Sequence, residues 1–371
     1  MIRIVYIVST LERCGPTNQL FYIIKYLDRN KFEPHIITLS PELRNSNWAE
    51  FESMGVYMYS LNLSRFKGVL YAKKSLRHLF AKISPNLIHT HLFRADILSS
   101  KFKYDYNNIA TVRNFPEQDY TSAYGRIIGR IMYMRHIRAL KKTVLSVGVS
   151  DAVSDNLKNK NKVSDVITIK NGVDTEIYFP PSNSDKKYLR EKLKLSVFGN
   201  IFISSGTLIV RKDPFFLINA WRKIFALKND YHLVFIGAGD LYEKCIRATY
   251  SCENIHVIGY VDNVIDYLKC GDYYVSASHS EGMPNAVLEA MACGLPVLLS
   301  NIDPHKEILA CNPGAGFCYE LGNEDSFCMY LDKLRDENRN IMAETSTKII
   351  AKYFSAQKMS KMYQREYEKI C

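Results

Sequence analysis

Four charged residues in the second half of the chain have types and spacings that suit an anionic ligand rich in hydroxyl groups. Glu281 and Glu289 stand eight positions apart, and the adjacent pair Arg211 and Lys212 precedes them along the chain. A carboxylate only accepts hydrogen bonds and so suits hydroxyl groups, whereas a guanidinium fork and an ammonium suit phosphate oxygens. Taken alone, each pair is weak evidence, because surface helices and exposed loops carry such residues by chance.

The residues around Glu281 are typical of a strand, a loop and a helix start. Glu281 comes after Tyr273–Ser276, a run with strand composition. Pro284 suits a first helical position, and Gly294 suits the end of the helix. A helix that begins here directs free backbone N–H groups and the positive end of its dipole toward the loop. The pattern therefore predicts a site for anions or hydroxyl groups at this helix mouth.

Histidines and an arginine follow two expected strands of the first half. His89 and His91 alternate along the chain and so face the same side, an arrangement that a metal ion could use. No matching pair of cysteine, histidine or aspartate residues accompanies them, so hydrogen-bonded structural histidines are the favoured interpretation. Arg113 directly follows the next strand, Ile109–Val112.

The elements that position these residues alternate between strands and helices along nearly the whole chain. Strands are expected at Ile2–Val8, His35–Leu39, Leu87–Thr90, Ile109–Val112, Val144–Val149, Val166–Ile169, Ile201–Ser205, His232–Ile236, His256–Ile258, Asp272–Ser276 and Pro296–Leu299. Helices are expected at Thr17–Leu27, Ser64–Ala81, Tyr124–Lys141, Pro214–Leu227, Leu241–Ala248, Val264–Lys269 and Pro284–Cys293. Such alternation predicts parallel sheets covered on both faces, with ligands beyond the carboxyl ends of the strands.

The alternation pauses at Pro180-Pro181, which suits a linker, and then starts again. The sequence therefore predicts an α/β protein of two Rossmann-like domains that face each other across a cleft. The expected domains are residues 1–178 and 179–345, and a final helical segment, 346–371, is expected to pack back on the first domain.

Composition and charge exclude several classes of protein. The chain has 371 residues, of which 47% are hydrophobic and 23% charged, and it contains no apolar run long enough to span a membrane. Its nine cysteines are an odd number with irregular spacing, which argues against a disulfide framework and zinc. The short apolar run at the N-terminus resembles a buried strand more than a signal peptide, so we expect a cytoplasmic protein.

The excess positive charge lies in the first half of the chain. Residues 1–178 carry 26 lysines and arginines against 15 acidic residues, while the remainder carries 23 of each. Nucleic acid, an anionic membrane surface or an anionic substrate could exploit such a field, and a solvated surface explains it equally well.

The stretch Glu-Gly-Met-Pro-Asn-Ala-Val-Leu-Glu-Ala-Met-Ala-Cys-Gly-Leu-Pro-Val at 281–297 resembles the donor-site signature of the family 4 retaining glycosyltransferases, which have the GT-B fold. Other segments are similar to the same family in the same order, at 9–19, 166–174, 206–214, 234–239 and 257–261. Three positions depart from the family pattern. Cys14 replaces the first of two glycines, Thr207 stands where an arginine is more usual, and Arg113 stands where a histidine is common.

The resemblance implies retaining transfer of a sugar from a nucleotide diphosphate sugar, in which the leaving diphosphate helps to deprotonate the acceptor. It implies catalytic roles for Glu281, Lys212 and Arg211: the two cations meet the diphosphate, and Glu281 holds sugar hydroxyls. Glu289 is expected to bind the ribose, and Arg211 to replace the arginine absent at Thr207. The remaining implied substrate-binding residues are Gly15, Pro16, His91, Arg113, Gly282, Met283, Pro284, Asn285, Ala286 and Val287. No metal ion or other cofactor is implied, because cations and helix ends replace Mg²⁺ and no Asp-x-Asp motif is present.

The expected partners are a nucleotide sugar, with UDP favoured over GDP, and a saccharide or lipid-diphosphate-linked acceptor for an O-antigen or capsule. An anionic membrane surface at the inner face of the cytoplasmic membrane is a further candidate partner, and no nucleic acid is expected. Whether Arg113 meets the donor or the acceptor stays open. Two alternatives also stay open: a nucleotide-sugar epimerase of the same fold, and a non-catalytic carbohydrate-binding protein.

Overall fold

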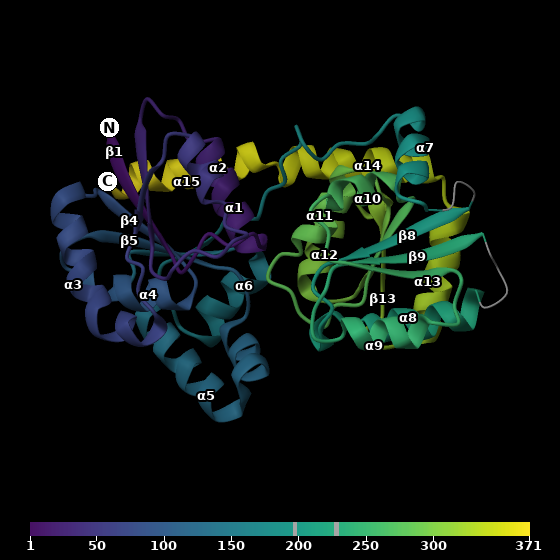
Figure 1. The fold of residues 1–371 in the computed structure, drawn as a ribbon, viewed down its shortest axis with the longest axis horizontal. Helices are drawn as coiled ribbons and strands as arrows, with labels where there is room; N and C mark the ends of the chain where they lie inside the picture. Colours follow the sequence, from purple (N-terminus) through teal and green to yellow (C-terminus); the bar gives the residue numbers. More distant parts are fainter. Residues whose placement is uncertain (196–198, 226–229) are drawn as a thin grey trace. The chain divides into compact units, whose positions relative to one another are not determined.

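The computed structural model describes residues 1–195, 199–225 and 230–371, which form two units (Figure 1). The first unit contains Met1–Gly172 together with Ala356–Cys371, and the second contains Val173–Ser355. In each unit a parallel sheet lies between layers of helices, so the expectation of two α/β domains is confirmed.

The first unit is built on a seven-stranded parallel sheet in the order β3-β2-β1-β4-β5-β6-β7. Its strands are β1 (Ile2–Val8), β2 (Phe32–Thr38), β3 (Tyr57–Ser60), β4 (Leu87–His91), β5 (Asn107–Val112), β6 (Leu145–Gly148) and β7 (Val166–Thr168). Its helices are α1 (Gly15–Lys25), α2 (Trp48–Ser53), α3 (Arg65–Ile83), α4 (Phe93–Ser99), α5 (Pro116–Leu140), α6 (Asp151–Asp155) and α15 (Ala356–Ile370). The central strands are continuous apolar runs because helices cover both of their faces.

The second unit repeats this order over six parallel strands, β10-β9-β8-β11-β12-β13. Its strands are β8 (Asn200–Ser205), β9 (Tyr231–Ile236), β10 (Ile255–Gly259), β11 (Tyr273–Ser276), β12 (Val297–Ser300) and β13 (Gly316–Tyr319). Its helices are α7 (Asn183–Lys192), α8 (Pro214–Phe225), α9 (Tyr242–Thr249), α10 (Val264–Cys270), α11 (Asn285–Ala292), α12 (Asp303–Leu309), α13 (Glu324–Asp336) and α14 (Arg339–Tyr353). The expected end of α8 at Leu227 lies outside the described residues.

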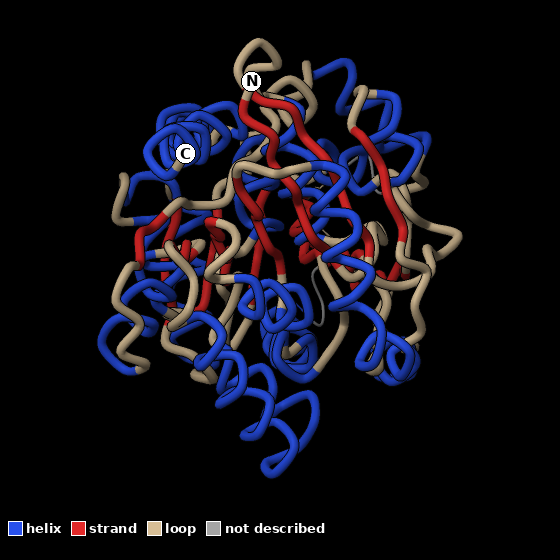
Figure 2. Tube along the Cα trace, turned by 90° about the vertical axis from the view of Figure 1, so that its left-hand side faces the viewer, coloured by secondary structure: helices blue, strands red, loops and turns tan. Residues whose placement is uncertain are grey.

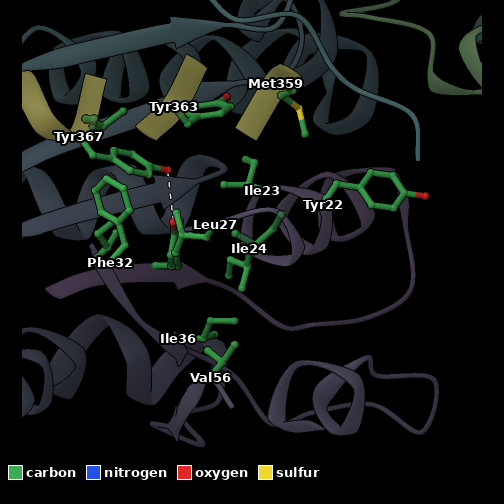
Figure 3. Packing of buried hydrophobic residues seen from close by; sticks show 14 of the residues in the cluster. Tyr22, Ile23, Ile24, Leu27, Phe32, Ile36, Val56, Met359, Tyr363 and Tyr367 are labelled. Carbon is green, nitrogen blue, oxygen red and sulfur yellow. Dashed lines mark hydrogen bonds between the residues drawn. The ribbon is translucent and has the colours of Figure 1, made fainter. Parts of the chain in front are cut away.

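Helix α15 belongs to the first unit although it ends the chain. Met359, Tyr363 and Tyr367 are buried against Ile23 of α1 and Phe32 of β2 in one apolar cluster (Figure 3). The phenol oxygens of Tyr367 and Tyr6, on β1, lie 3.4 Å apart. The last helix of the chain therefore completes the core beside a sheet whose strands come from the N-terminal part of the sequence.

The unit boundaries differ from the expected divisions at 178 and 345. Residues from Val173 onward belong to the second unit, where the Val173 N–H donates to the carbonyl of Phe354 at 2.8 Å. Helix α14 also belongs to this unit, because it packs on α11, so only α15 returns to the first unit. The proline pair at 180–181 is followed by a helix, α7, that the sequence did not suggest.

Helix α5 is longer than the expected 124–141 and is broken inside. It begins at Pro116, and Gly125 has non-helical angles, φ 77° and ψ 169°. The two halves project from the first unit at the lower edge of Figure 1 and Figure 2.

Both sheets reverse their strand order at one point, and in such sheets ligands bind beyond the strand ends at that reversal. In the first unit the reversal lies between β1 and β4, and in the second it lies between β8 and β11. The expected site residues lie at or beyond the ends of these strands, except Arg113, which follows the neighbouring strand β5.

Candidate functional site

An ion-pair cluster forms beyond the carboxyl ends of β8 and β11. Lys212 and Arg211 belong to a 3₁₀ turn, Val210–Lys212, in the loop after β8, and Glu281 lies in the loop after β11. Lys212 Nζ lies 2.5 Å from Glu281 Oε1, and Arg211 Nη1 lies 3.0 Å from Glu281 Oε2. The three residues expected to be catalytic thus meet in one place, because their strands are neighbours in the sheet.

The two cations keep Glu281 charged. Glu281 is buried, and burial by itself raises the pKa of a carboxyl group. Lys212 and Arg211 outweigh burial and lower the pKa of Glu281 to about 2. These three residues therefore carry two positive charges against one negative charge, which leaves a net positive charge among them for an anion.

Backbone contacts tie the two loops together. The N–H of His279 donates to the carbonyl of Arg211 at 2.8 Å, and the guanidinium of Arg211 donates to the carbonyl of Ser280. The ring Nε2 of His279 lies 2.9 Å from Asp213 Oδ2, while Asp213 Oδ1 accepts from the N–H of Phe216 in the first turn of α8. Asp213 thereby connects the start of α8 to the loop that carries Glu281.

Glycines allow the loops after β8 and β9 to approach each other. A Cβ on Gly237 would lie 2.1 Å from the carbonyl oxygen of Gly206, and one on Gly239 would lie 2.5 Å from that of Leu208. Gly237 also has a φ of +134°, which favours glycine. Because these glycines have no side chains, the backbones of the two loops can lie close together. Lys212 projects toward the same point, since its Nζ would lie 3.7 Å from a Cβ built on Gly206.

A small hollow opens at this strand reversal. It is lined by hydroxyl groups, backbone and the ammonium of Lys212, from Ser204, Ser205, Gly206, Thr207, Leu208, Lys212, Pro214, Phe235, Tyr274, Ser276 and Ser278. Tyr274 is fully buried, and its hydroxyl donates to the carbonyl of Ser205 at 3.2 Å. The lining thus offers one cation and several hydrogen-bonding groups.

The mouth of α11 presents backbone N–H groups as expected, with one correction. Pro284 is not the first helical residue: it precedes the helix in extended conformation, and α11 begins at Asn285 because the Pro284 carbonyl accepts from the N–H groups of Val287 and Leu288. The N–H groups of Gly282, Met283 and Ala286 have no acceptor among the described residues. Gly282 and Met283 are buried, and buried donors without an acceptor indicate a place for a ligand.

Glu289 lies one turn inside α11, where it does not contact Glu281. It is partly buried, and no described residue donates a hydrogen bond to its carboxylate. Burial raises the pKa of Glu289 to about 7, and Lys212 only partly opposes this effect. The pKa values of these two carboxyl groups are therefore shifted in opposite directions: Glu281 stays ionised, and Glu289 titrates near neutral pH.

His305 is a site residue that the sequence reasoning missed. It lies on α12, fully buried, and its Nδ1 donates to the carbonyl of Ser300 at 2.8 Å. Burial lowers its pKa to about 4 although the charge of Glu281 opposes this, so the ring is neutral and Nε2 is an acceptor. No described residue pairs with that Nε2. The only signal in the sequence is a histidine five residues after the end of a strand, which is too common to single out.

The expected site residues of the first unit form a second group. His91 ends β4, Arg113 follows β5, and Arg113 Nη2 donates to His91 Nδ1 at 2.9 Å. Since a guanidinium only donates, the neutral ring carries its proton on Nε2, which is buried without a described partner. Gly15 and Pro16 are the first two residues of α1, after the strand β1 that neighbours β4.

His89 has the structural role that was favoured for it. Its Nδ1 lies 2.8 Å from the hydroxyl of Tyr367 and its Nε2 lies 2.8 Å from that of Thr111, so both nitrogens are occupied. Burial lowers the pKa of His89 to about 3, which keeps the ring neutral. Among the described residues no group of three or more potential ligands could hold a metal ion.

Two family models match successive parts of the chain. The model for glycosyltransferase family 4 matches residues 14–177, and the model for glycosyl transferases group 1 matches residues 185–352. The chain belongs to the family 4 glycosyltransferases. The second match contains the ion-pair cluster, the hollow and the mouth of α11, and the first contains His91 and Arg113.

Relatives of the chain include enzymes of bacterial surface polysaccharides. The chain is 26% identical to the capsular polysaccharide biosynthesis glycosyltransferase CapH of Staphylococcus aureus, over 86% of this chain and 87% of the relative. It is 32% identical to the UDP-Gal:alpha-D-GlcNAc-diphosphoundecaprenol alpha-1,3-galactosyltransferase of Escherichia coli, over 51% of this chain and 50% of that enzyme. It is 24% identical to the O-antigen biosynthesis glycosyltransferase WclY of Escherichia coli, over 99% of this chain and 98% of the relative. The protein is therefore a glycosyltransferase with capsule and O-antigen enzymes among its relatives.

The fold agrees with this family. The structure matches that of HepE from Anabaena, solved in complex with UDP, with a TM-score of 0.82 and 13% identity over 99% of this chain and 100% of HepE. At this identity the match supports the GT-B fold and no more. In the part of the chain that the structure describes, no helix is both long and apolar enough to cross a membrane.

Proposed function

We propose that this family 4 glycosyltransferase transfers a sugar, with retention of anomeric configuration, from a UDP-sugar to a lipid-diphosphate-linked saccharide. The observation that carries the proposal is the Glu281 carboxylate held between Lys212 and Arg211 at the strand reversal of the second unit. The product would be an intermediate of a capsule or an O-antigen.

The cations have the chemistry that a diphosphate leaving group needs. Negative charge grows on the diphosphate as the bond to the sugar breaks, and fixed cations near it stabilise that charge without rearranging. Lys212 lines the hollow with its ammonium, and Arg211 supplies a fork beside it. We propose that Arg211 replaces the arginine absent at Thr207, a residue that itself lines the hollow.

The hydrogen-bonding groups at the mouth of α11 suit the sugar and the ribose. The Glu281 carboxylate would accept from sugar hydroxyls, and the N–H groups of Gly282 and Met283, which have no acceptor among the described residues, would donate to them, with Asn285, Ala286 and Val287 in the first turn of α11 beside them. Glu289, which has no described donor of its own, would accept from the ribose hydroxyls. Positioning by such groups lowers the entropic part of the barrier.

The choice of UDP and of a lipid-linked acceptor is supported by the relatives. The Escherichia coli relative is named for UDP-Gal and a diphosphoundecaprenol acceptor, and HepE was solved with UDP. In the first unit, the Nε2–H group of His91, Arg113 and the start of α1 at Gly15 and Pro16 are the proposed substrate contacts. We propose that transfer needs no metal ion, since Lys212 and Arg211 provide the charge.

The proposal is tested by turnover with a panel of nucleotide sugars and an undecaprenyl-diphosphate-linked acceptor. We expect UDP release that requires the acceptor. NMR should show a glycosidic bond with the anomeric configuration of the donor, and EDTA should leave the rate unchanged. An inverted bond or a requirement for Mg²⁺ would contradict the mechanism, and turnover with GDP-sugars alone would contradict the donor.

The same assay separates the alternatives. A nucleotide-sugar epimerase would release free sugar without an acceptor, and a carbohydrate-binding protein would bind ligand without any release of nucleotide. Glu281→Gln, which keeps the shape but removes the charge, should lose turnover while the protein stays folded. The exposed Glu253→Gln provides the matched control.

A further inference from the structure

Arg113 is a partly buried cation of the first unit that has no acidic partner. Its guanidinium donates to two neutral groups, His91 Nδ1 at 2.9 Å and Asn171 Oδ1 at 3.4 Å. Among the described residues, no aspartate or glutamate pairs with it. Arginines that are withdrawn from water are usually paired with an anion, because an unpaired charge is costly to bury. The first unit therefore holds a positive charge that lacks its counter-ion.

The surroundings of Arg113 supply no negative charge either. Burial lowers the pKa of Arg113, and the groups that oppose this effect are the side chains of Tyr363 and Cys14, neither of which carries a carboxylate. The first turn of α1, which follows Cys14, contains no acidic residue. Burial also lowers the pKa of His91 well below its usual range, so this ring stays neutral beside the guanidinium. The cluster therefore has a net charge of one positive unit.

Two N–H groups of the cluster have no acceptor. Because Arg113 donates to Nδ1 of the neutral His91 ring, the ring carries its proton on Nε2. His91 is only 2% exposed, and no described residue accepts from its Nε2–H. The Nε–H of Arg113 is also buried without a described partner. Buried donors without an acceptor are costly, so two of them at one cation indicate a ligand with acceptor oxygens.

The side chains behind these donors hold them in place. The His91 ring stacks on Tyr6, with 6.4 Å between ring centroids, and lies 4.3 Å from the ring of His89, which is fixed by two hydrogen bonds of its own. On the other side, Gln19 of α1 exchanges two hydrogen bonds of 2.9 Å with the backbone of Gly172, next to Asn171. Donors fixed in this way bind a ligand with little loss of conformational entropy.

One positive charge and two free donors match a carboxylate better than a phosphate. A carboxylate carries one negative charge and two acceptor oxygens. A terminal phosphate carries about 1.5 to 2 negative charges at pH 7 and three acceptor oxygens, which exceeds what this cluster offers. A phosphate inside a diphosphate linkage has substituents on two sides, which hinder its approach to buried donors. A carboxylate on a sugar ring is a terminal group, so it can reach them.

We propose that Arg113 and His91 form a subsite for the carboxylate of an acidic sugar, a hexuronic acid, carried by the donor or by the acceptor. The proposal rests on the proposed function and narrows its substrate class. It also gives a use to the departure at position 113, because the histidine that is common there offers no permanent charge, whereas arginine is always charged.

The experiment compares substrates that differ only in a carboxylate or a hydroxymethyl group at C6. The donor pair is UDP-glucuronic acid and UDP-glucose, and the acceptor pair is an undecaprenyl-diphosphate-linked disaccharide that ends in glucuronic acid or in glucose. The corresponding galacturonic acid and galactose compounds are measured alongside. The wild type should have a kcat/KM about 10²-fold or more higher for the acidic member of one pair, because the neutral member leaves the buried groups unpaired. Which pair shows the preference identifies the substrate that carries the carboxylate.

Three variants test whether Arg113 causes the preference. Arg113→His should remove most of the preference without lowering kcat/KM for the neutral member. Arg113→Lys, which keeps the charge but loses the fork, should retain part of it. Arg77→Gln is the matched control, because it removes an exposed arginine of the same unit and should leave both rates unchanged. The Tm of each variant shows whether it is folded.

Two results would overturn the proposal. The first is a wild type that uses the acidic and neutral members of every pair equally. The second is an Arg113→His variant that keeps the full preference, or that loses activity equally on acidic and neutral substrates, since Arg113 would then contact a group that both members share, such as the diphosphate.

Binding measurements separate this proposal from the proposed function. Calorimetry with UDP-glucuronic acid and UDP-glucose, and saturation-transfer NMR with methyl glucuronide and methyl glucoside, need no sugar transfer. A preference for the acidic compounds that Arg113→His loses, without any transfer, would overturn the function alone. Transfer without a preference in any pair would overturn the carboxylate subsite alone.

Discussion

Glu281 and Lys212 form an ion pair, 2.5 Å between carboxylate and ammonium, although they are far apart in sequence and lie in loops after two different strands. The pair exists because β8 and β11 are neighbours in the sheet of the second unit. Because Arg211 shares the carboxylate, loss of either cation leaves Glu281 paired with the other, whereas loss of Glu281 leaves two adjacent cations.

Lys212→Ala should lower kcat for sugar transfer by ~10²–10³-fold, the usual loss when one fixed charge-stabilising group is removed. The measurement is kcat with saturating donor and acceptor. Lys223→Ala is the matched control, because that exposed lysine pairs with the carboxylates of Glu324 and Asp325 on the same unit, away from Glu281. Wild-type turnover by Lys212→Ala would remove the ammonium from the mechanism.

Glu289→Gln should change how stability depends on pH. The pKa of Glu289 is raised from 4.5 to about 7 in the folded protein, so between these values the folded state holds a proton that the unfolded state has released. Stability of the wild type therefore falls as pH rises through this window and is level above it. The Tm of Glu289→Gln relative to wild type should increase from about pH 5 to about pH 8. The exposed Glu253→Gln should show no such trend.

UDP binding should follow the same titration. If Glu289 accepts hydrogen bonds from the ribose, protonation removes acceptor capacity, and affinity for UDP should weaken as pH falls below about 7. Calorimetric titration of UDP at several pH values measures this effect. A wild-type profile as flat as that of Glu289→Gln would argue that Glu289 does not touch the nucleotide.

Gly237→Ala should destabilise the second unit because its Cβ would lie 2.1 Å from the carbonyl oxygen of Gly206. The strain should cost ~2 kcal/mol or more and weaken UDP binding, since the two loops must separate. Gly322→Ala is the matched control, because Gly322 also has a positive φ, +75°, but nothing lies within 4 Å of a Cβ built on it. Comparison of the Tm of the two variants separates the cost of the steric clash from the cost of the backbone dihedral alone. Equal decreases in Tm would contradict the close approach of Gly237 and Gly206.

Tyr367→Phe should destabilise the first unit through its C-terminal helix. The hydroxyl lies 2.8 Å from His89 Nδ1, and its loss leaves that buried nitrogen without a partner, at a cost of ~1–3 kcal/mol. Denaturant unfolding gives the free energy of unfolding, with the exposed Tyr250→Phe as control. A change no larger than that of the control would show that the Tyr367 hydroxyl does not help to hold α15.

The sequence by itself determined the alternation of strands and helices, because side-chain periodicity and β-branched runs are local properties. It also located Glu281, Lys212 and Arg211 in one ordered motif set and placed the excess charge in the first half. It missed α7, since a polar helix after two prolines has the composition of a linker, and it placed Pro284 one residue inside α11.

Only the tertiary structure decided which distant residues meet. The Glu281–Lys212 pair depends on strand order, and the burial of Tyr363 and Tyr367 depends on α15 returning to the first unit. The basic and apolar residues of α5 interleave along the sequence, so their pattern alone is ambiguous. The inner face of α5 became defined only through the close approach of Gly129 to Tyr120 and the contact of His136 with Asp96 on α4, because a helix has no inside until another element covers one side of it.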